Sequence, residues 1–402
     1  MNRFASELRQ RLDAIQAQGL HRVLRRIDSA QSRLIRFNDQ EFLNFSSNDY
    51  LGLADHPRLK TAALEATARY GTGSGASRLI CGSLAPHHEL ETALAEFKGT
   101  GGALSFASGY AAALGTIGAL VGKEDIIVLD KLVHASLVDA ARLSGAKLRV
   151  FPHNDLAALE EILKWAADRP TGSESRGSQV LIVTESIFSM DGDAAPMAEL
   201  VALKERFGAW LMVDEAHATG VFGDHRRGVA EAAGVTGRIE IQLGTLGKAL
   251  GSAGGYICGA PELIDYLINR ARSFIFSTAP PPAAAAAAHA AVDLVRSPEG
   301  AERAAQLWAN IAEVRAMLGA AGWPVPEFSS PIVPLVIGDE TAAVAAATHL
   351  RERGIFIPAI RYPTVARGSA RLRLTLSAAH TREDLERLAG ALVEIRPTLP
   401  LS

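Results

Sequence analysis

The chain has 402 residues, of which 48% are hydrophobic and 21% are charged, and its formal net charge is −3 at pH 7. That length allows two domains with separate cores, and the slightly acidic balance excludes nucleic acid as the main partner. No window has the roughly eighteen uninterrupted apolar residues of a membrane span. Two cysteines are too few for a disulfide framework or a zinc site, so we expect reduced thiols, a cytoplasmic protein and no metal.

The start of the chain carries apolar side chains at helical spacing. Phe4, Leu8, Leu12 and Ile15 recur every three or four positions, which predicts an amphipathic helix. The stretch is rich in arginine, but the acidic residues within it argue against a transit peptide. We therefore expect residues 1–45 to form an N-terminal arm whose helix packs on the body of the protein.

Helical patterns then alternate with short apolar runs. Strands that are apolar throughout and separated by helices indicate a mostly parallel sheet covered on both faces, in an α/β fold. The polar, turn-rich stretch 169–178 is expected to be a surface loop. The expected strands are 103–106, 126–129, 148–151, 180–184, 211–213, 239–243 and 256–258, and the expected helices are 55–70, 86–99, 111–120, 156–167 and 197–207.

A change of pattern follows the triple proline at 280–282. An alanine-rich run opens a long helix there, and shorter apolar runs at 332–337, 355–357 and 372–375 follow with helices between and after them. This indicates a smaller α+β domain. We therefore expect residues 46–282 to form the large domain and residues 283–402 the small one.

An aspartate, a histidine and a lysine occur along the chain in an order that indicates a particular chemistry. Asp214 ends an apolar strand, His217 follows three positions later, and Lys248 lies in the glycine-rich run 244–251. Pyridoxal phosphate (PLP) needs a lysine for its Schiff base, an acid that keeps the pyridine nitrogen protonated and a donor near the ring hydroxyl. Ligands of open α/β sheets bind beyond the carboxyl ends of the strands, where Asp214 lies. A lone aspartate there is often a helix cap, but the ordered set favours PLP.

A phosphate site is expected where the strand 103–106 meets the next helix. Gly109 and Tyr110 lie at this turn, and the first turn of a helix offers unpaired N–H groups and the positive end of its dipole. Thr245, three residues before Lys248, would add a hydroxyl. The run around Lys248 is not a P-loop, because Gln242 stands where that motif requires glycine.

Two further residues follow strand ends. His134 lies just past the strand that ends at Asp130, where it either stacks over the cofactor ring and holds a substrate carbonyl or simply caps a helix. Ser189 lies in the run 185–193, whose acidic residues do not have EF-hand spacing, and we expect it to point at the cofactor.

Two arginines lie in the last expected strand. We expect Arg371 and Arg373 to face opposite sides of the run 370–375, so that one of them points into the cleft. An arginine there can clamp a carboxylate through two parallel hydrogen bonds.

Together these residues resemble the α-oxoamine synthases, a family of fold-type I PLP-dependent transferases, over about residues 20–395. The resemblance implies a mostly parallel central sheet flanked by helices, a homodimer, and condensation of an amino acid with an acyl thioester with loss of CO₂. The segments that carry it are 44–53, 134–136, 189–193, 214–220 and 244–251.

Segments 19–22, 360–365 and 371–377 are most similar to the branch of the family in biotin biosynthesis. That branch condenses L-alanine with a pimeloyl thioester, carried by CoA or by an acyl carrier protein.

The resemblance also implies residue roles. Lys248 forms the Schiff base and removes the Cα proton, Asp214 pairs with the pyridine nitrogen, and His134 stacks on the ring. At the ring hydroxyl it implies contacts from His217 and Ser189. At the phosphate it implies contacts from Gly109, Tyr110 and Thr245, with Ser277 or Thr278 from a second subunit. At the substrates it implies contacts from Arg22, Asn48, Thr364 and Arg373, of which Arg373 binds the carboxylate.

Small departures from the family's pattern concern the neighbours of these residues. Glu215 follows Asp214 where some members have a second aspartate, residues 244–246 read Gly-Thr-Leu where some have Thr-Phe, and Tyr362, where proline is frequent, could reshape the acyl pocket. Sister enzymes share the cofactor residues, so 5-aminolevulinate synthase, 2-amino-3-ketobutyrate CoA ligase and serine palmitoyltransferase stay open. An aminotransferase and a non-catalytic PLP-binding module are the more distant alternatives.

Overall fold

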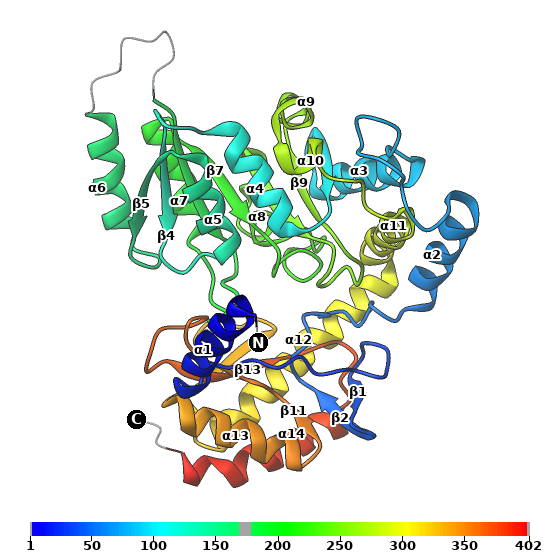
Figure 1. The fold of residues 1–402 in the computed structure, drawn as a ribbon, viewed down its shortest axis with the longest axis vertical. Coiled ribbons are helices and arrows are strands. Elements are labelled where there is room, and N and C mark those ends of the chain that lie inside the picture. The colour runs from blue at the N-terminus through cyan, green and yellow to red at the C-terminus, as the bar shows by residue number, and fades with distance from the viewer. Residues whose placement is uncertain (1, 169–177, 400–402) are drawn as a thin grey trace.

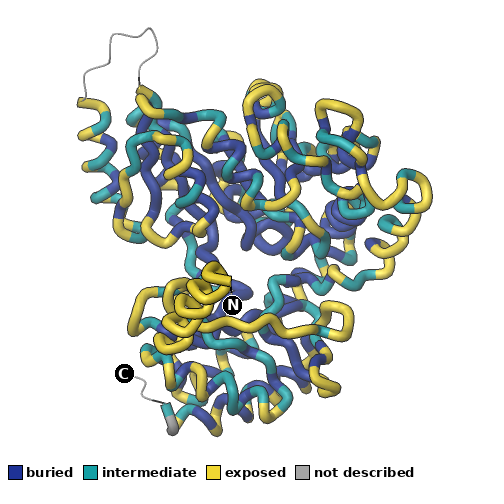
Figure 2. Tube along the Cα trace, viewed as in Figure 1, coloured by how far each residue is buried: buried dark blue, intermediate teal, exposed yellow. Residues whose placement is uncertain are grey.

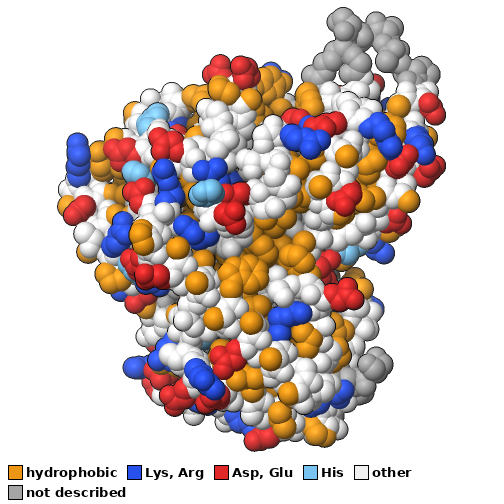
Figure 3. Space-filling view, turned by 180° about the vertical axis from the view of Figure 1, so that it is seen from behind, with side chains coloured by type: hydrophobic (Ala, Val, Ile, Leu, Met, Phe, Trp, Pro, Cys, Tyr) orange, Lys and Arg blue, Asp and Glu red, His pale blue; other side chains and the backbone are white. Residues whose placement is uncertain are grey.

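The computed structural model describes residues 2–168 and 178–399, which fold into two lobes (Figure 1). The larger lobe holds a seven-stranded sheet, and helix α12, Pro298–Ala320, runs from it into the smaller lobe. The stretch 169–178, expected as a surface loop, lies outside the described residues except for Ser178. The back of the molecule carries basic and acidic side chains side by side (Figure 3).

The large sheet has the order β3-β9-β8-β7-β6-β4-β5. Its described neighbours pair in parallel except where β9 is involved, which confirms the expected mostly parallel sheet. All residues of β4 are buried; because side chains alternate along a strand, both faces of the sheet are covered there. The strands are β3 Gly102–Phe106, β4 Ile126–Asp130, β5 Lys147–Phe151, β6 Val180–Glu185, β7 Trp210–Asp214, β8 Ile241–Thr245 and β9 Gly255–Gly259.

Helices of the large lobe follow the expected alternation. Their apolar faces close over the sheet and supply part of one continuous core. They are α2 Pro57–Tyr70, α3 Ala85–Lys98, α4 Gly109–Leu120, α5 Ala135–Ser144, α6 Leu156–Ala167, α7 Met197–Phe207, α8 Val229–Ala232, α9 Pro261–Arg270, α10 Arg272–Ile275 and α11 Pro282–Arg296, with the 3₁₀ turn η1 Thr236–Arg238.

The small lobe contains two three-stranded sheets. One joins β10 Ile332–Gly338, β13 Ala370–Thr375 and β12 Ala359–Ile360, all antiparallel, and the other joins β1 Leu34–Phe37, β2 Gln40–Asn44 and β11 Ile355–Phe356. The hairpin of β1 and β2 was not expected from the sequence. Its two turn residues, Asn38 and Asp39, both have positive φ, as a type I′ turn requires. The helices are α12, α13 Glu340–Glu352 and α14 Arg382–Ile395, followed by the 3₁₀ turn η2 Arg396–Thr398.

The lobes do not divide at the expected residues. β2 pairs with β11, so part of the expected N-terminal arm is built into the small lobe. α11 packs along α2 and α3 of the large lobe, and the change of lobe follows it, at the start of α12. The expected boundary before residue 283 therefore precedes that change by one helix.

The N-terminal helix α1, Arg3–Ala17, forms as expected but does not pack as expected. It has no buried residue, and its apolar Phe4 is 67% exposed. Figure 2 shows the helix exposed along its length. The expectation that it packs on the body is wrong for the single chain, because its apolar stripe meets no apolar surface of the same chain.

A buried ion pair supports the loop that follows β7. The ammonium of Lys98, at the end of α3, lies 2.5 Å from Glu215, and both side chains are almost inaccessible to solvent. The other Glu215 oxygen accepts the N–H of Ala230 at 2.9 Å, and Lys98 also donates to the carbonyl of Arg227. Glu215 thus fixes the loop directly after Asp214.

Breaking this pair from one side is expected to destabilise the protein strongly. Glu215→Gln leaves the Lys98 charge buried without its partner, which costs about 3–5 kcal/mol. Urea unfolding measures the loss. Glu205→Gln, which breaks the exposed pair of Glu205 and Arg238, is the control and should shift the midpoint far less. Equal shifts for the two variants would contradict this account.

Candidate active site

The carboxyl ends of neighbouring parallel strands bring the candidate residues together. β4 ends at Asp130, β6 at Glu185, β7 at Asp214 and β8 at Thr245. Glu185 lies opposite Asp214 in the register of β6 and β7. Because these ends meet at one edge of the sheet, the loops that follow them surround a common space, where open α/β sheets bind ligands.

Lys248 and His217 are in direct contact. Their Nζ and Nε2 atoms lie 2.8 Å apart, and Nδ1 of His217 lies 2.5 Å from the hydroxyl of Tyr50. Burial and the nearby Lys248 charge hold the pKa of His217 well below its usual range, so its ring is neutral. Burial also lowers the pKa of Lys248 to about 8, against the opposing charges of Asp214 and Glu185. Sequence reasoning missed Tyr50, whose contact with His217 spans 167 residues.

Two buried carboxyl groups face this lysine. Burial raises the pKa of Asp214, although Lys248 and the N–H of Ala216, which Oδ1 accepts at 2.9 Å, act against it. Burial and the neighbouring Asp214 raise the pKa of Glu185 to about 8. Sequence reasoning did not assign Glu185 a role, although its place at a strand end is the signal that identified Asp214.

The start of α4 has the geometry of the expected phosphate site, which stays a prediction. The helix begins at Gly109, two residues before the expected start, because the Ser108 hydroxyl caps it by accepting the N–H of Ala111 at 3.0 Å. Gly109 and Tyr110 therefore lie in the first turn, whose N–H groups have no partner within the helix. A methyl group built on Gly109 would lie 3.9 Å from Cβ of Thr245, so the backbone and that side chain border the same space.

His134 takes the capping role that the sequence left open, and its expected place over the cofactor ring stays a prediction. It caps α5, and its Nδ1 lies 2.8 Å from the Ser136 hydroxyl. Partial burial lowers its pKa, while the charge of Asp214 opposes that shift. The cap orients the ring, and Asp214 and Lys248 are near enough for their charges to affect its pKa.

Arg371 and Arg373 lie on the same face of β13. The expectation that they face opposite sides is wrong, because side chains two positions apart in a strand share a face. Nη1 of Arg371 donates to Asp191 at 2.6 Å. Nε of Arg373 donates to the carbonyl of Ser189 at 2.6 Å, and its Nη1 donates to Oδ1 of Asn48 at 3.1 Å.

Asn48 and Arg373 are thus brought together as a candidate carboxylate site. Nη1 of Arg373 donates to the Thr375 hydroxyl as well, at 3.0 Å. These bonds hold the guanidinium in one orientation, at the junction of the two lobes.

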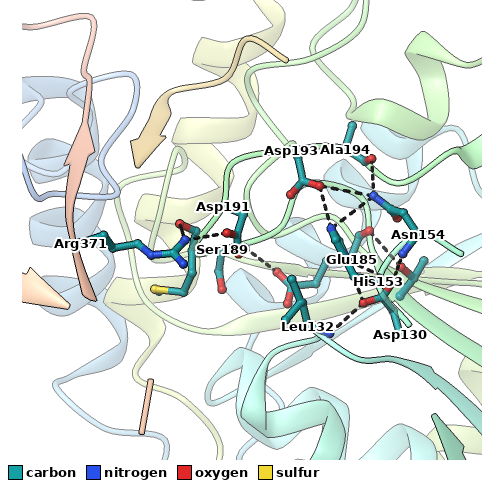
Figure 4. A network of polar contacts seen from close by, with 12 residues as sticks. Asp130, Leu132, His153, Asn154, Glu185, Ser189, Asp191, Asp193, Ala194 and Arg371 are labelled. Atoms are coloured by element: carbon teal, nitrogen blue, oxygen red, sulfur yellow. Dashed lines mark hydrogen bonds and ion pairs between the residues drawn. The ribbon is translucent and has the colours of Figure 1, made fainter. Parts of the chain in front are cut away.

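The turn 189–193 is held from both lobes (Figure 4). On one side Arg371 contacts Asp191; on the other, His153 bridges Asp193, at 2.7 Å, and Asp130, at 3.0 Å. Although burial alone would lower it, the bonds to the two aspartates raise the pKa of His153 to about 10. His153, which follows the end of β5, was not among the site residues expected from the sequence.

The remaining candidates divide into two groups. Arg22 approaches the Thr364 hydroxyl at 3.5 Å, and both line a cavity of about 670 Å³ together with Tyr362. Ser277 and Thr278 are not joined to the site: Thr278 pairs with Ser77, and the Ser277 hydroxyl donates to the carbonyl of Thr278. Their expected contact with a second subunit stays a prediction.

The described groups fit the PLP expected from the sequence. An amine with a lowered pKa, a buried carboxyl group and a neutral imidazole surround one space, and the helix start suited to a phosphate borders it through Thr245. Within residues 2–168 and 178–399, no group of three potential metal ligands is arranged to hold a metal ion. No described helix is both long and apolar enough to cross a membrane.

Comparison with known proteins gives consistent matches. The family model of the class I and II aminotransferases matches residues 40–392. An 8-amino-7-oxononanoate synthase of Geobacter metallireducens is 50% identical over 392 residues, which cover 98% of this chain and 97% of that protein.

Many solved structures match this chain, and two of them, both related enzymes, match most of it. A serine palmitoyltransferase of S. paucimobilis with bound PLP-myriocin aldimine has a TM-score of 0.90 at 28% identity, covering 98% of this chain and 97% of that one. An 8-amino-7-oxononanoate synthase of Francisella tularensis has a TM-score of 0.74 at 28% identity, covering 89% and 98%.

The amine of Lys248 is expected to react at a lower pH than an ordinary lysine. With a pKa of about 8, its neutral form, which attacks carbonyls, accumulates well below the usual 10.5. Reductive alkylation of the cofactor-free protein with a small aldehyde, followed by peptide mass spectrometry, should give a midpoint near 8 for Lys248. The same residue in the urea-unfolded chain is the control. An unchanged midpoint on unfolding would contradict the prediction.

Proposed function

The chain belongs to the 8-amino-7-oxononanoate synthase family, and we propose that it condenses L-alanine with a pimeloyl thioester to 8-amino-7-oxononanoate, CO₂ and a free thiol. This is a PLP-dependent acyltransferase reaction of biotin biosynthesis. The contact of Lys248 with His217 beside the buried Asp214 carries the proposal, together with the 50% identity to the Geobacter metallireducens synthase over 98% of this chain.

PLP would be held by the residues around this edge. Lys248 would bind it covalently, Asp214 would pair with its pyridine nitrogen, and His134 would lie on its ring. Contacts to the ring hydroxyl would come from His217 and Ser189, and contacts to the phosphate from Gly109, Tyr110 and Thr245, with Ser277 or Thr278 of a second subunit. When bound, the cofactor supplies an electron sink for negative charge at Cα of the amino acid.

The chain's own groups supply binding and proton transfer. Arg373, oriented by Asn48, binds the carboxylate of L-alanine until it leaves as CO₂. Lys248 takes the Cα proton and later returns one, and a pKa near 8 suits both transfers. The neutral His217 keeps the amine of Lys248 in place, and His134 donates to the thioester carbonyl.

The acyl end is assigned to the cavity beside the N-terminal segment. Arg22, Thr364 and Tyr362 all line this cavity. The thioester is carried by CoA or by a transiently bound acyl carrier protein. We place the reaction in the cytoplasm, since Cys81 and Cys258 are free thiols, and in a homodimer.

Lys248→Ala is expected to abolish turnover, because no other group replaces its amine at Cα. Release of free thiol is followed with PLP, each small amino acid and a panel of acyl thioesters. Lys131→Ala, an exposed lysine in the loop after β4, is the control and should keep its activity. Normal turnover by Lys248→Ala would contradict the assignment of Lys248 as the catalytic lysine. Preference for glycine or for another thioester would favour a sister enzyme, and a keto-acid product without thioester would favour an aminotransferase.

Arg373→Lys is expected to raise KM for L-alanine about ten- to hundred-fold, because a lysine cannot keep the hydrogen bonds to Ser189 and Asn48 and still reach the carboxylate. KM for the thioester should change much less. Arg371→Lys, which loses its bond to Asp191 on the same face, is the matched comparison and should affect the amino acid less. An equal rise in both KM values for Arg373→Lys would remove it from the carboxylate site.

A further inference from the structure

Glu185 is a buried carboxyl group to which the proposed reaction assigns no role. It is the last residue of β6, and its side chain is fully enclosed. One of its oxygens, Oε1, has no hydrogen-bond partner in the described structure. A buried polar atom of this kind is rare in folded proteins and calls for a functional explanation.

The other oxygen of Glu185 joins two loops of the site. Oε2 accepts the backbone N–H of Ser189 at 3.1 Å, and the backbone N–H of His134 is near enough to lower the pKa of the same carboxyl group. β6 lies between β4 and β7 in the sheet, so Glu185 lies between the loop that carries His134 and Asp214, the last residue of β7. One carboxyl group thus lies against the backbones of both His134 and Ser189, the two residues assigned to the ring face and the ring hydroxyl.

The charges around Glu185 decide which carboxyl group is ionised. Asp214 faces it from β7, Lys248 from the segment after β8, and Tyr50 from the segment after β2. Two carboxylates at adjacent strand ends in a buried site repel each other, and one retains its proton. Burial, and then Asp214, raise the pKa of Glu185 to about 8, which favours Glu185 as the carboxyl group that keeps the proton.

We propose that Glu185 is a positioning residue, which as a neutral carboxyl group ties the backbones of His134 and Ser189 together and leaves Asp214 as the charged partner of the pyridine nitrogen. The inference rests on the proposed function for the roles of His134 and Ser189. The protonation of Glu185 is a property of the chain alone and is tested without turnover.

The first test compares Glu185→Gln with the wild-type full-length chain without cofactor. Because the pKa of Glu185 is raised on folding, its contribution to stability is present below its ordinary value of 4.5 and is lost as the pH rises through about 8. The amide of the Glu185→Gln variant cannot ionise. The urea midpoint of the wild type should therefore fall more steeply between slightly acidic and alkaline pH than that of Glu185→Gln. Parallel profiles would overturn the proposal, whatever reaction the enzyme catalyses.

The second test separates position from charge in the PLP-loaded enzyme. Glu185→Gln keeps an acceptor oxygen of the same reach and should keep kcat close to wild type. Glu185→Ala frees both loops, and kcat should fall about 10²-fold, the cost of a misplacement of about 1 Å. A loss in Glu185→Gln as large as in Glu185→Ala would show that a charged Glu185 is required. Unchanged kcat in Glu185→Ala would show that it positions nothing, and either result overturns the proposal.

Should Glu185→Ala fail to fold, Glu185→Gln decides alone, through its pH profile and its kcat. Loss of the visible absorption of bound PLP in Glu185→Gln would also contradict a neutral role. If the wild type lacked synthase activity, the proposed function would fall while the pH profile of stability would still decide the protonation of Glu185.

Discussion

Asp214, Glu185 and Lys248 meet at the carboxyl ends of neighbouring strands, where burial opposes the charged form of each group. The sheet makes this meeting unavoidable, because Glu185 and Asp214 are paired in register. Their opposite shifts in pKa, upward for the carboxyl groups and downward for the amine, follow from one cause. A lysine that is neutral for part of the time near pH 8 is what a proton transfer at carbon requires.

Much of the remaining structure serves to keep these groups in place. The Tyr50 hydroxyl contacts Nδ1 of His217, and the ion pair of Lys98 and Glu215 fixes the loop after β7. The enclosed pair explains why glutamate is tolerated after Asp214, where some relatives carry aspartate: its longer side chain reaches Lys98 and the N–H of Ala230.

The sequence predicted the features that depend on local pattern. The buried parallel strands were expected from uninterrupted apolar runs, and Asp214, His217 and Lys248 from their order along the chain. Contacts between distant segments were not accessible in this way. Tyr50 meets His217 only in the fold, and the hairpin of β1 and β2 carries Asn-Asp in its turn where Asn-Gly would have been the recognisable signal. The expectation for Arg371 and Arg373 was wrong because strand geometry was misapplied. The expectation for α1 was wrong because it assumed that the apolar stripe of an amphipathic helix is always covered by the same chain.

The turn 189–193 has a mechanical consequence. Arg371 and Arg373 of the small lobe form hydrogen bonds to this turn, and His153 and Glu185 of the large lobe bind it from the other side. All four side chains therefore contact the same five-residue turn that carries Ser189. The turn links the two lobes, because a displacement at its contacts with Arg371 and Arg373 is transmitted through these five residues to its contacts with His153 and Glu185.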